Sequence, residues 1–252
     1  VLLLAAGMGT RLRPITNNLP KCLVPICGKP LLEWWLRLFN ESKKIKTVFI
    51  NTFHLRGQVL SFIEGYKTKV DFDIVLFDEP HLLGTGGTVR AIYNQIQSKS
   101  IENGLLVAHA DNLSCFDIDE FLSCHDKRQP FINTTMMTFN TENPDSCGIV
   151  ELNEENVLVK MHEKVQGIQG KTANGAVFLF DKKALNIFKE DCMIFDISLD
   201  FIPKNYGKIN CYHNNRYHRD IGNLESYNKA QQEFPEILRK CGNIYGEGCN
   251  DN

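Results

Sequence analysis

Short apolar runs alternate with segments of helical periodicity over the first 110 residues, and this alternation restricts the fold more than any other feature. The strand-like runs lie at 1–4, 47–52, 72–77 and 105–110, of which the first and the last are the most apolar, and the helical segments lie at 30–39, 58–66 and 88–96. Short apolar runs bounded by turn residues are typical of buried strands. Strands that alternate with helices predict an α/β fold with a parallel sheet and right-handed crossovers. Ligands of such sheets bind beyond the carboxyl ends of the strands, so functional residues are expected directly after each run.

The second half of the chain has a more strand-rich pattern. Strands are expected at 131–139 and 176–180, a hairpin at 148–152 and 157–162, and helices at 196–203 and 224–234. No Pro-, Gly- or Ser-rich linker divides the chain, so we expect one domain over 1–252. It would consist of a first half (1–130), a strand-rich second half (131–234) and a C-terminal tail (235–252). The tail is expected to be loosely ordered from Cys241 on.

The charge balance limits the partners. Lys and Arg together number 28 and Asp and Glu number 30, which gives a formal net charge of −2. Proteins that bind nucleic acid need a basic surplus, so nucleic acid is not expected as the main partner. A local cationic pocket for a small polyanion remains allowed. No apolar run approaches the roughly 18 residues that a membrane helix needs, so no membrane association is expected.

The cysteine pattern bears on the compartment. Nine cysteines occur without a CxxC pair, which is typical neither of a disulfide framework nor of a zinc site. We interpret them as reduced, mostly buried thiols and expect a cytoplasmic location. The chain starts abruptly in the apolar run from Val1 to Leu4, and we expect a few residues to precede it.

The strongest motif follows the first apolar run. It reads LAAGMGTRLRP over residues 4–14 and is followed by Pro20-Lys21. Glycine lacks a Cβ, so the backbone can approach a bulky anion and offer N–H groups to its oxygens. Arg11 adds a fork that matches phosphate geometry, and Lys21 adds a point charge. The motif predicts that a nucleoside polyphosphate binds to Leu4, Ala5, Ala6, Gly7, Gly9, Thr10, Arg11 and Lys21.

Two commoner phosphate loops are excluded by the same motif. A Walker loop needs Gly-x4-Gly-Lys-Ser/Thr, which the chain lacks. The dinucleotide fingerprint needs a third glycine, where Leu12 stands. A plain strand-to-helix turn with two structural glycines is the alternative, and the basic residues that accompany the glycines argue against it.

Asp111 stands directly after the apolar run at 105–110. A carboxylate at the carboxyl end of a strand can hold Mg²⁺, a hard ion that prefers oxygen ligands. The alternative for Asp111 taken alone is a turn or helix-capping aspartate.

The opening motif resembles the signature of the sugar-phosphate nucleotidyltransferases, the enzymes that make NDP-sugars. Their pattern is LAAGxGTRLxPLT…PK, and the chain departs from it only in having Ile15 in place of leucine. The similarity continues to about residue 234. Glu79-Pro80 and 83–87 (LGTGG) resemble the EP…LGTAG segment, and Asp111 falls where the family has its metal-binding aspartate. The later matches are Gly148, Glu163-Lys164, Asn174-Gly175 and Asp220.

The resemblance implies a fold and a reaction. The fold would be a Rossmann-like, glycosyltransferase-A-like three-layer sandwich, with a mixed, mostly parallel sheet and a strand-rich sugar-binding lobe. The reaction would be NTP plus sugar 1-phosphate giving NDP-sugar plus pyrophosphate. The sugar phosphate is already ionised, so catalysis reduces to positioning and charge neutralisation. Arg11 and Lys21 would neutralise the triphosphate, and Asp111 with Asp220 would hold Mg²⁺. Residues 1–130 would bind the nucleotide and 131–234 the sugar phosphate.

The sugar-phosphate site is likewise implied by the resemblance. Lys164 would contact the sugar phosphate as a fourth catalytic residue, although an isolated lysine is usually a solvated one. The other expected contacts are Asn112, Gly148, Glu163, Asn174, Asp196 and Asp220. Val165 replaces the family's usual proline, and 195–200 departs from the Phe-Glu-Lys-Asp pattern of many relatives. Asp196 has a helix cap as its alternative.

The base-binding segment is closest to that of the mannose- and heptose-1-phosphate guanylyltransferases. Gly84, Thr85 and Gly86 are small enough for an aromatic ring to lie near the backbone. Glu79 could accept hydrogen bonds from guanine, and a solvated carboxylate is its alternative. GTP and a manno-configured sugar 1-phosphate are therefore the expected substrates. Transfer of uridylyl, cytidylyl or thymidylyl to another hexose phosphate is the runner-up.

Two alternatives outside this enzyme class are a non-catalytic nucleotide-sugar sensor and a dinucleotide-dependent oxidoreductase. A sensor would be expected to lack a metal ligand or the phosphate-facing lysine, both of which are present. The Trp34-Trp35 pair is interpreted as helix packing, with one ring available for a subunit contact in a homodimer.

Overall fold

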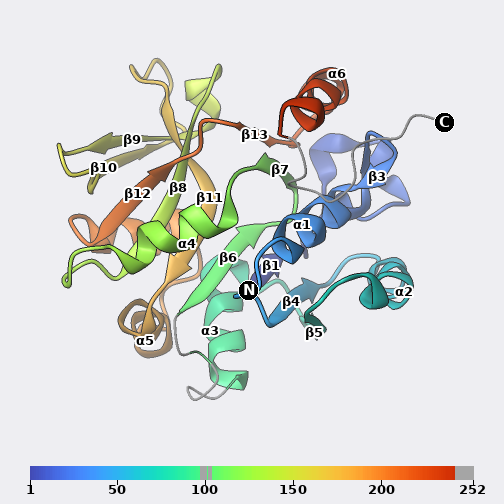
Figure 1. Ribbon diagram of the computed structural model, residues 1–252, viewed down its shortest axis with the longest axis horizontal. Helices are drawn as coiled ribbons and strands as arrows, with labels where there is room; N and C mark the ends of the chain where they lie inside the picture. The colour runs from blue at the N-terminus through green and yellow to red at the C-terminus, as the bar shows by residue number, and fades with distance from the viewer. Residues whose placement is uncertain (97–100, 102–103, 242–252) are drawn as a thin grey trace.

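The computed structural model describes residues 1–96, 101 and 104–241. Within these residues a nine-stranded mixed sheet runs in the order β10-β9-β11-β6-β1-β4-β5, with β8 beside β11 and β12 beside β8 (Figure 1). Its strands are β1 (Leu2–Leu4), β4 (Thr47–Thr52), β5 (Asp73–Asp78), β6 (Leu105–His109), β8 (Thr134–Asn140), β9 (Gly148–Leu152), β10 (Leu158–Glu163), β11 (Thr172–Phe180) and β12 (Ile209–His213). The predicted α/β class and mixed sheet are confirmed.

The first half of the sheet is parallel, as its sequence pattern predicts. Strand β1 lies between β4 and β6, and β4 pairs with β5, all in parallel register. The connecting helices are α1 (Leu31–Asn40), α2 (Arg56–Tyr66) and α3 (Gly84–Gln95). Neighbouring residues of β1 point to opposite faces, because Leu3 packs in one hydrophobic core with α1 and α2, whereas Leu2 packs in another with α3. Two cores on the two faces of one sheet make three layers.

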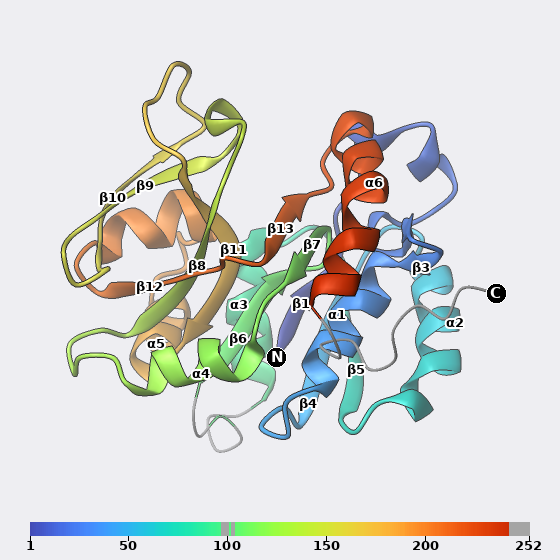
Figure 2. The same ribbon diagram turned by 45° about the horizontal axis from the view of Figure 1, so that its top comes forward.

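Strand β11 joins the two halves of the molecule. It runs antiparallel to β6 on one side and to β8 on the other. Near its start, Ala173 also pairs with Ile149 of β9. The hairpin β9–β10 matches the predicted one closely, and β12 adds a parallel strand beyond β8. Helices α4 (Ile118–Asp126) and α5 (Lys182–Glu190) belong to this region (Figure 2).

A two-stranded ribbon stands apart from the main sheet. Strand β7 (Asn112–Cys115) pairs antiparallel with β13 (Tyr217–Asp220), so that Asp220 lies opposite Asn112. Helix α6 (Leu224–Lys240) follows β13 and lies alongside the ribbon in both views (Figures 1 and 2). The ribbon was not predicted from the sequence, because its short strands mix polar and apolar residues without a clear period.

Several predicted boundaries are corrected by the structure. Helix α6 continues past Pro235 to Lys240, although it was expected to end at Phe234. The segment expected as one helix at 196–203 is a π-helical turn, Ile197–Phe201, followed by a 3-10 turn, Ile202–Asn205. The remaining short elements are β2 (Pro25–Ile26), β3 (Lys29–Pro30) and 3-10 turns at Thr10–Leu12, Ile15–Asn17, Lys21–Leu23, Lys67–Lys69 and Pro144–Ser146. Residues 242–252, which make up most of the tail expected to be loose, lie outside the described part.

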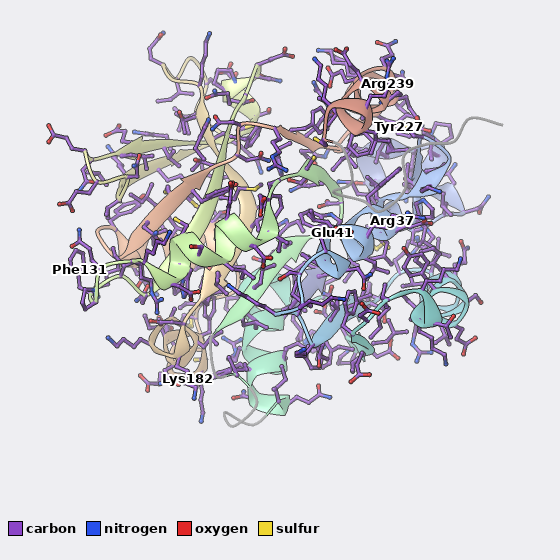
Figure 3. The ribbon with its side chains drawn as sticks, viewed as in Figure 1. Arg37, Glu41, Phe131, Lys182, Tyr227 and Arg239 are labelled. Carbon is purple, nitrogen blue, oxygen red and sulfur yellow. The ribbon has the colours of Figure 1, made fainter. Side chains whose placement is uncertain are left out.

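The tryptophan pair is buried within the chain. Trp34 and Trp35 are 3% and 2% exposed, so the expectation that one ring is available for a subunit contact is wrong. Each indole N–H donates to a backbone carbonyl, that of Trp34 to Ile26 and that of Trp35 to Asn112. Side chains such as Phe131 and Lys182 lie instead at the periphery of the molecule (Figure 3). Among the described residues no helix is long and apolar enough to cross a membrane.

Candidate functional site

The loop after β1 forms a pocket at the carboxyl end of the parallel strands. The pocket has a volume of about 190 Å³. It is lined by Gly7, Met8, Gly9, Thr10, Arg11, Lys21, Asp111 and Gly222. Of the residues predicted to bind the nucleotide, six therefore converge on one cavity, while Met8 and Gly222 were not predicted. Leu4 belongs to β1, Ala5 is half-buried and Ala6 is buried behind the loop.

Gly9 holds the turn of this loop. Its φ of +62° lies in the left-handed region, which favours glycine. A Cβ at this position would come within 3.0 Å of the Thr16 Cγ2 and 3.1 Å of the Lys21 Cβ. The Thr16 hydroxyl donates to the Gly9 carbonyl at 2.6 Å and fixes the turn. An added Cβ at Gly7 would meet no protein atom within 4 Å, so the packing of the protein itself does not require that glycine.

A buried lysine lies between two carboxylates at the rim of the pocket. The Lys21 Nζ is 2.6 Å from Asp111 Oδ2 and 3.7 Å from Asp220 Oδ1. Lys21 is only 6% exposed, whereas the side chains of Asp111 and Asp220 are 32% and 55% exposed. We call these three residues the acidic corner. The predicted pairing of the two aspartates in space is thus present, together with a lysine contact that the sequence did not predict.

The pKa values of the two carboxyl groups shift in opposite directions. Burial alone raises the pKa of Asp111, but the Lys21 ammonium and its hydrogen bond outweigh burial and hold that pKa below its usual range. Burial and then the negative charge of Asp111 raise the pKa of Asp220. The positive charge of Lys21 therefore acts on both carboxyl groups, and more strongly on the nearer Asp111.

Short elements from distant parts of the chain assemble the acidic corner. Asp111 lies between β6 and β7, and its carbonyl accepts from the Ile221 N–H at 3.3 Å. The Trp35 indole donates to the Asn112 carbonyl at 2.8 Å and so ties β7 to helix α1. Because Asp220 pairs opposite Asn112, the ribbon sets the separation of the two acids.

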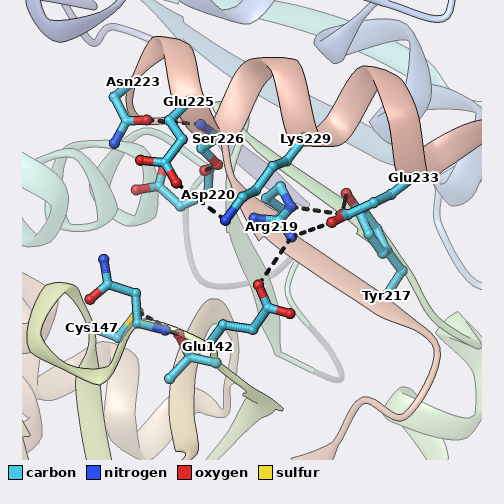
Figure 4. Close-up of polar contacts among 12 residues, drawn as sticks. Glu142, Cys147, Tyr217, Arg219, Asp220, Asn223, Glu225, Ser226, Lys229 and Glu233 are labelled. Carbon is cyan, nitrogen blue, oxygen red and sulfur yellow. Dashed lines mark hydrogen bonds and ion pairs between the residues drawn. The ribbon is translucent and has the colours of Figure 1, made fainter.

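Helix α6 braces the strand that carries Asp220. Figure 4 shows Arg219 reaching Glu233 of α6 through two hydrogen bonds, at 2.9 and 2.8 Å. The Tyr217 hydroxyl donates to the same carboxylate at 3.0 Å. Glu142, from the loop after β8, lies 4.0 Å from Arg219 on the other side. Arg219, the neighbour of Asp220, is therefore paired with acidic residues of two different elements.

Glu79 is buried and bonded within the protein. It is 6% exposed, and Asn51 Nδ2 donates to its Oε1 at 2.9 Å. The Thr88 hydroxyl donates to the same oxygen, and the Leu83 N–H donates to Oε2 at 3.2 Å. Asn51 also accepts from the Ala5 N–H at 2.5 Å. Glu79 thus anchors the loop after β1 through Asn51, a role that no sequence pattern indicated.

The glycines of the expected base segment are explained partly by packing. A Cβ at Gly84, whose φ is +75°, would come within 2.4 Å of the Phe195 carbonyl oxygen. The Gly86 N–H donates to that oxygen at 2.8 Å. The Thr85 hydroxyl accepts from the Ile197 N–H at 2.8 Å and lies 3.3 Å from Asp196 Oδ2. The segment at 84–86 is therefore packed directly against 194–197.

Asp196 caps the π-helical turn. Its Oδ1 accepts from the Ser198 and Leu199 N–H groups at 2.7 and 3.0 Å. The capping alternative considered for Asp196 is therefore realised, and little of its carboxylate is left for a sugar. Asn174 donates to the Ser198 hydroxyl at 3.3 Å and accepts from the Ala176 N–H at 2.8 Å.

Gly148, Glu163 and Lys164 form what we call the sugar-side group. A Cβ at Gly148 would come within 2.6 Å of Glu163 Oε2. The Lys164 Nζ lies 3.3 Å from Glu163 Oε1, and its side chain is 64% exposed. Lys164 has a φ of +51°, unusual for a residue with a Cβ, and its N–H donates to the Cys147 carbonyl at 3.0 Å. No described contact joins this group to the acidic corner.

The acidic corner fits a divalent cation. Within the described residues no group of three or more His, Cys, Asp or Glu side chains could hold a metal ion. Two carboxylate oxygens converge on Lys21 Nζ, and Mg²⁺ is commonly held by one or two carboxylates together with water and substrate phosphates.

A glycine loop at the carboxyl end of a parallel sheet is typical of ligand sites in α/β proteins, and its backbone N–H groups suit an anion. Comparison of the sequence with known families identifies the family. The chain belongs to the nucleotidyl transferase family, whose profile matches residues 1–236.

Three similar proteins illustrate the range of the family. The chain is 29% identical over 232 residues to the D-glycero-alpha-D-manno-heptose 1-phosphate guanylyltransferase of Campylobacter jejuni, covering 90% of this chain and 96% of that protein. It is 24% identical over 213 residues to the UTP--glucose-1-phosphate uridylyltransferase of Synechocystis, covering 81% and 54%. The crystal structure of HddC from Yersinia pseudotuberculosis complexed with GMP-PN shares the fold, with a TM-score of 0.74, 22% identity and coverage of 92% and 98%. The chain spans only 41% of the bifunctional protein GlmU of Methanocaldococcus jannaschii.

Proposed function

We propose that this protein transfers a nucleotidyl group from an NTP to a sugar 1-phosphate and releases pyrophosphate. The convergence of Lys21, Asp111 and Asp220 at the glycine-rich pocket carries the proposal, because it combines a phosphate cradle with two ligands for a divalent cation. Membership of the nucleotidyl transferase family supports it.

Each residue of the pocket has a defined task in this proposal. The loop at Gly7 and Gly9 leaves room for phosphate oxygens, and Arg11 with Lys21 neutralises the charge of the triphosphate and the leaving pyrophosphate. Asp111 and Asp220 would hold Mg²⁺, which supplies charge neutralisation at the phosphate oxygens when bound. The oxygen that attacks the α-phosphorus belongs to the sugar phosphate, so the protein needs no nucleophile of its own.

The sugar-side group is proposed to bind the second substrate. Lys164 would contact the phosphate of the sugar 1-phosphate, and Glu163 and Asn174 would accept or donate hydrogen bonds to sugar hydroxyls. The exposed ammonium of Lys164 is available for this contact because its ion pair is with an adjacent residue. Asn112 and Asp220 would border this substrate from the ribbon side.

We further propose GTP and a manno-configured sugar 1-phosphate as substrates. The heptose 1-phosphate guanylyltransferase of C. jejuni, which aligns along almost its full length, supports this choice, as does the GMP-PN complex of HddC. The uridylyltransferase of Synechocystis supports the alternative of another base. Three donors occupy three of the roughly four lone-pair sites of Glu79, and in this proposal guanine would donate to the fourth.

The test is a matrix of five NTPs against a panel of sugar 1-phosphates, scored by pyrophosphate release with and without Mg²⁺. Release with GTP and mannose or heptose 1-phosphate is expected, and Asp111→Asn serves as the inactive control. Nucleotide binding without turnover in every cell of the matrix would identify a sensor instead. Pyrophosphate release with a different NTP would support the proposed reaction but show that GTP is not the substrate.

A further inference from the structure

A single buried side chain joins the loop after β1 to the residue proposed to bind the base. Asn51, the last but one residue of β4, is 3% exposed. Its Oδ1 accepts from the Ala5 N–H at 2.5 Å, and its Nδ2 donates to Glu79 Oε1 at 2.9 Å. A backbone N–H can only donate and a carboxylate can only accept, so the two partners admit one orientation of the amide. Asn51 therefore sets the position of Ala5 relative to Glu79, which follows a different strand.

The backbone around Asn51 is fixed by the sheet. Strand β4 lies between β1 and β5, and Asn51 is opposite Leu4 on one side and Phe77 on the other. The Glu79 N–H donates to the Thr52 carbonyl at 3.0 Å and so extends this pairing beyond the end of β5. Because its backbone is held on both sides, the side chain of Asn51 is a rigid spacer between the loops that follow β1 and β5.

The two oxygens of Glu79 are occupied unequally. Oε1 accepts from the Asn51 amide and from the Thr88 hydroxyl of α3. Within the described part of the chain, Oε2 accepts only from the Leu83 N–H, at 3.2 Å. Each carboxylate oxygen has two lone pairs, so Oε1 is filled and Oε2 retains one site. The oxygen that can accept from a base is therefore Oε2, and Asn51 is one of the two groups that determine this.

We propose, on the basis of the proposed contact of Glu79 with the base, that Asn51 is a positioning residue that couples the choice of base to the placement of the phosphates. By donating to Oε1, Asn51 commits Oε2 to the base. By accepting from the Ala5 N–H, it fixes the loop that brings Gly7 and Gly9 to the phosphates. The base and the phosphates of a nucleotide are covalently joined, so both contacts form together only where the loop and the carboxylate are in register.

The test measures nucleotide binding to the full chain by titration calorimetry in the presence of Mg²⁺. The ligands are the five NTPs and inorganic triphosphate, which has phosphates but no base. The Kd of the weakest NTP divided by that of the tightest is called the NTP ratio. Asn51→Ala removes both hydrogen bonds, so the NTP ratio should fall at least about tenfold and the Kd for inorganic triphosphate should rise about threefold or more.

A double variant, Asn51→Asp with Glu79→Gln, reverses the hydrogen bond between the two side chains. The carboxylate at 51 still accepts from the Ala5 N–H and now also accepts from the amide at 79. The oxygen of that amide takes the place of Oε2. Both the NTP ratio and the Kd for inorganic triphosphate should therefore return to within about fivefold of the wild type. No recovery over Asn51→Ala would mean that Asn51 does not act as a spacer, and this would overturn the proposal.

The control is Thr52→Val. Thr52 is a buried neighbour on the other face of β4, and its hydroxyl donates to Asp78. This variant should keep the NTP ratio and the Kd for inorganic triphosphate within a factor of two of the wild type. Thermal midpoints identify the folded variants, and the double variant decides the question where Asn51→Ala does not fold.

A folded Asn51→Ala protein with an NTP ratio within a factor of two of the wild type would overturn the proposal. The assay is independent of turnover. Selective binding that is lost in Asn51→Ala, in a wild type without turnover, would support the role of Asn51 and contradict the proposed reaction. Turnover by the wild type together with an unchanged NTP ratio in Asn51→Ala would do the reverse.

Discussion

The acidic corner and the sugar-side group differ in how far the free protein already organises its charges. In the corner, the side chain of Lys21 is 7% exposed and held 2.6 Å from Asp111. In the sugar-side group, the side chain of Lys164 is 64% exposed and paired only with its neighbour Glu163. A preorganised charge pair acts mainly on the transition state, whereas an exposed charge acts mainly on substrate binding. The comparison therefore separates residues that should affect turnover from residues that should affect affinity.

Asp111→Asn should have the largest effect. Removing this charge deletes one proposed cation ligand and leaves Lys21 without its close partner, so turnover should fall by at least about 100-fold. Pyrophosphate release measures the loss, and the thermal midpoint reports whether the fold is kept. Asp71→Asn is the control, because Asp71 is an exposed aspartate paired with Lys43. Turnover within a factor of two of the wild type would remove Asp111 from the proposed site.

Gly84→Ala tests whether the base segment is rigidly packed. Its φ of +75° and the 2.4 Å approach to the Phe195 carbonyl should together lower the free energy of unfolding by roughly 2 kcal/mol or more. Urea denaturation measures the change. The control is Gly57→Ala in α2, where a Cβ meets no atom within 4 Å. Equal stability of the two variants would mean that the segment at 84–86 can move away from 194–197.

Acid should weaken the packing of α4 on the strand-rich half through His125. Burial, and then the positive charge of Arg128, lowers the pKa of His125 to about 4. Its Nδ1 is 2.7 Å from the Thr135 hydroxyl, which donates to Asn210, so Nδ1 carries the proton; within the described chain its buried Nε2 has no hydrogen-bond partner.

The sign of this pH effect follows from linkage. The unfolded histidine takes up a proton below about pH 6.5 and the folded one only near pH 4, so stability is lost as the pH falls between these values. Between about pH 7.5 and about pH 5 the loss should be roughly 2 kcal/mol. Urea unfolding of the wild type and of His125→Gln at both pH values measures it. A variant that loses as much stability as the wild type would contradict the assignment.

Lys164→Ala should have the smallest of these effects. Loss of an exposed charge should raise KM for the sugar 1-phosphate about tenfold and leave turnover and the thermal midpoint close to those of the wild type. Steady-state kinetics with saturating NTP give both constants. Lys160→Ala is the control, because Lys160 is an exposed lysine on β10, the strand that ends directly before Lys164. A large fall in turnover with an unchanged KM would mean that Lys164 acts on turnover, as the acidic corner is expected to do.

The sequence predicted the main sheet well and parts of the site poorly, for physical reasons. Thr47–Thr52 was placed with correct bounds because β-branched and aromatic residues fill most of it, between two segments of helical pattern. The strand Tyr217–Asp220 was missed, because its four residues, YHRD, contain no apolar run. The burial of Glu79 also could not be predicted, since its partner Asn51 lies on a different strand and no local pattern joins them. The glycines at 84 and 86 indicated correctly that another group lies close to their backbone. In the structure the backbone of 194–195 lies there.

The ribbon has a consequence for how this site can vary. Asp111 leaves a strand that is hydrogen-bonded on both sides, while Asp220 sits at the end of a strand paired on one side only and followed by a long helix. Shifting Asp220 by a fraction of an ångström requires only a small bend of that pair of strands, whereas shifting Asp111 would disturb the nine-stranded core. Evolution or design can thus retune the spacing of the two acids from the α6 side, with the phosphate loop left untouched.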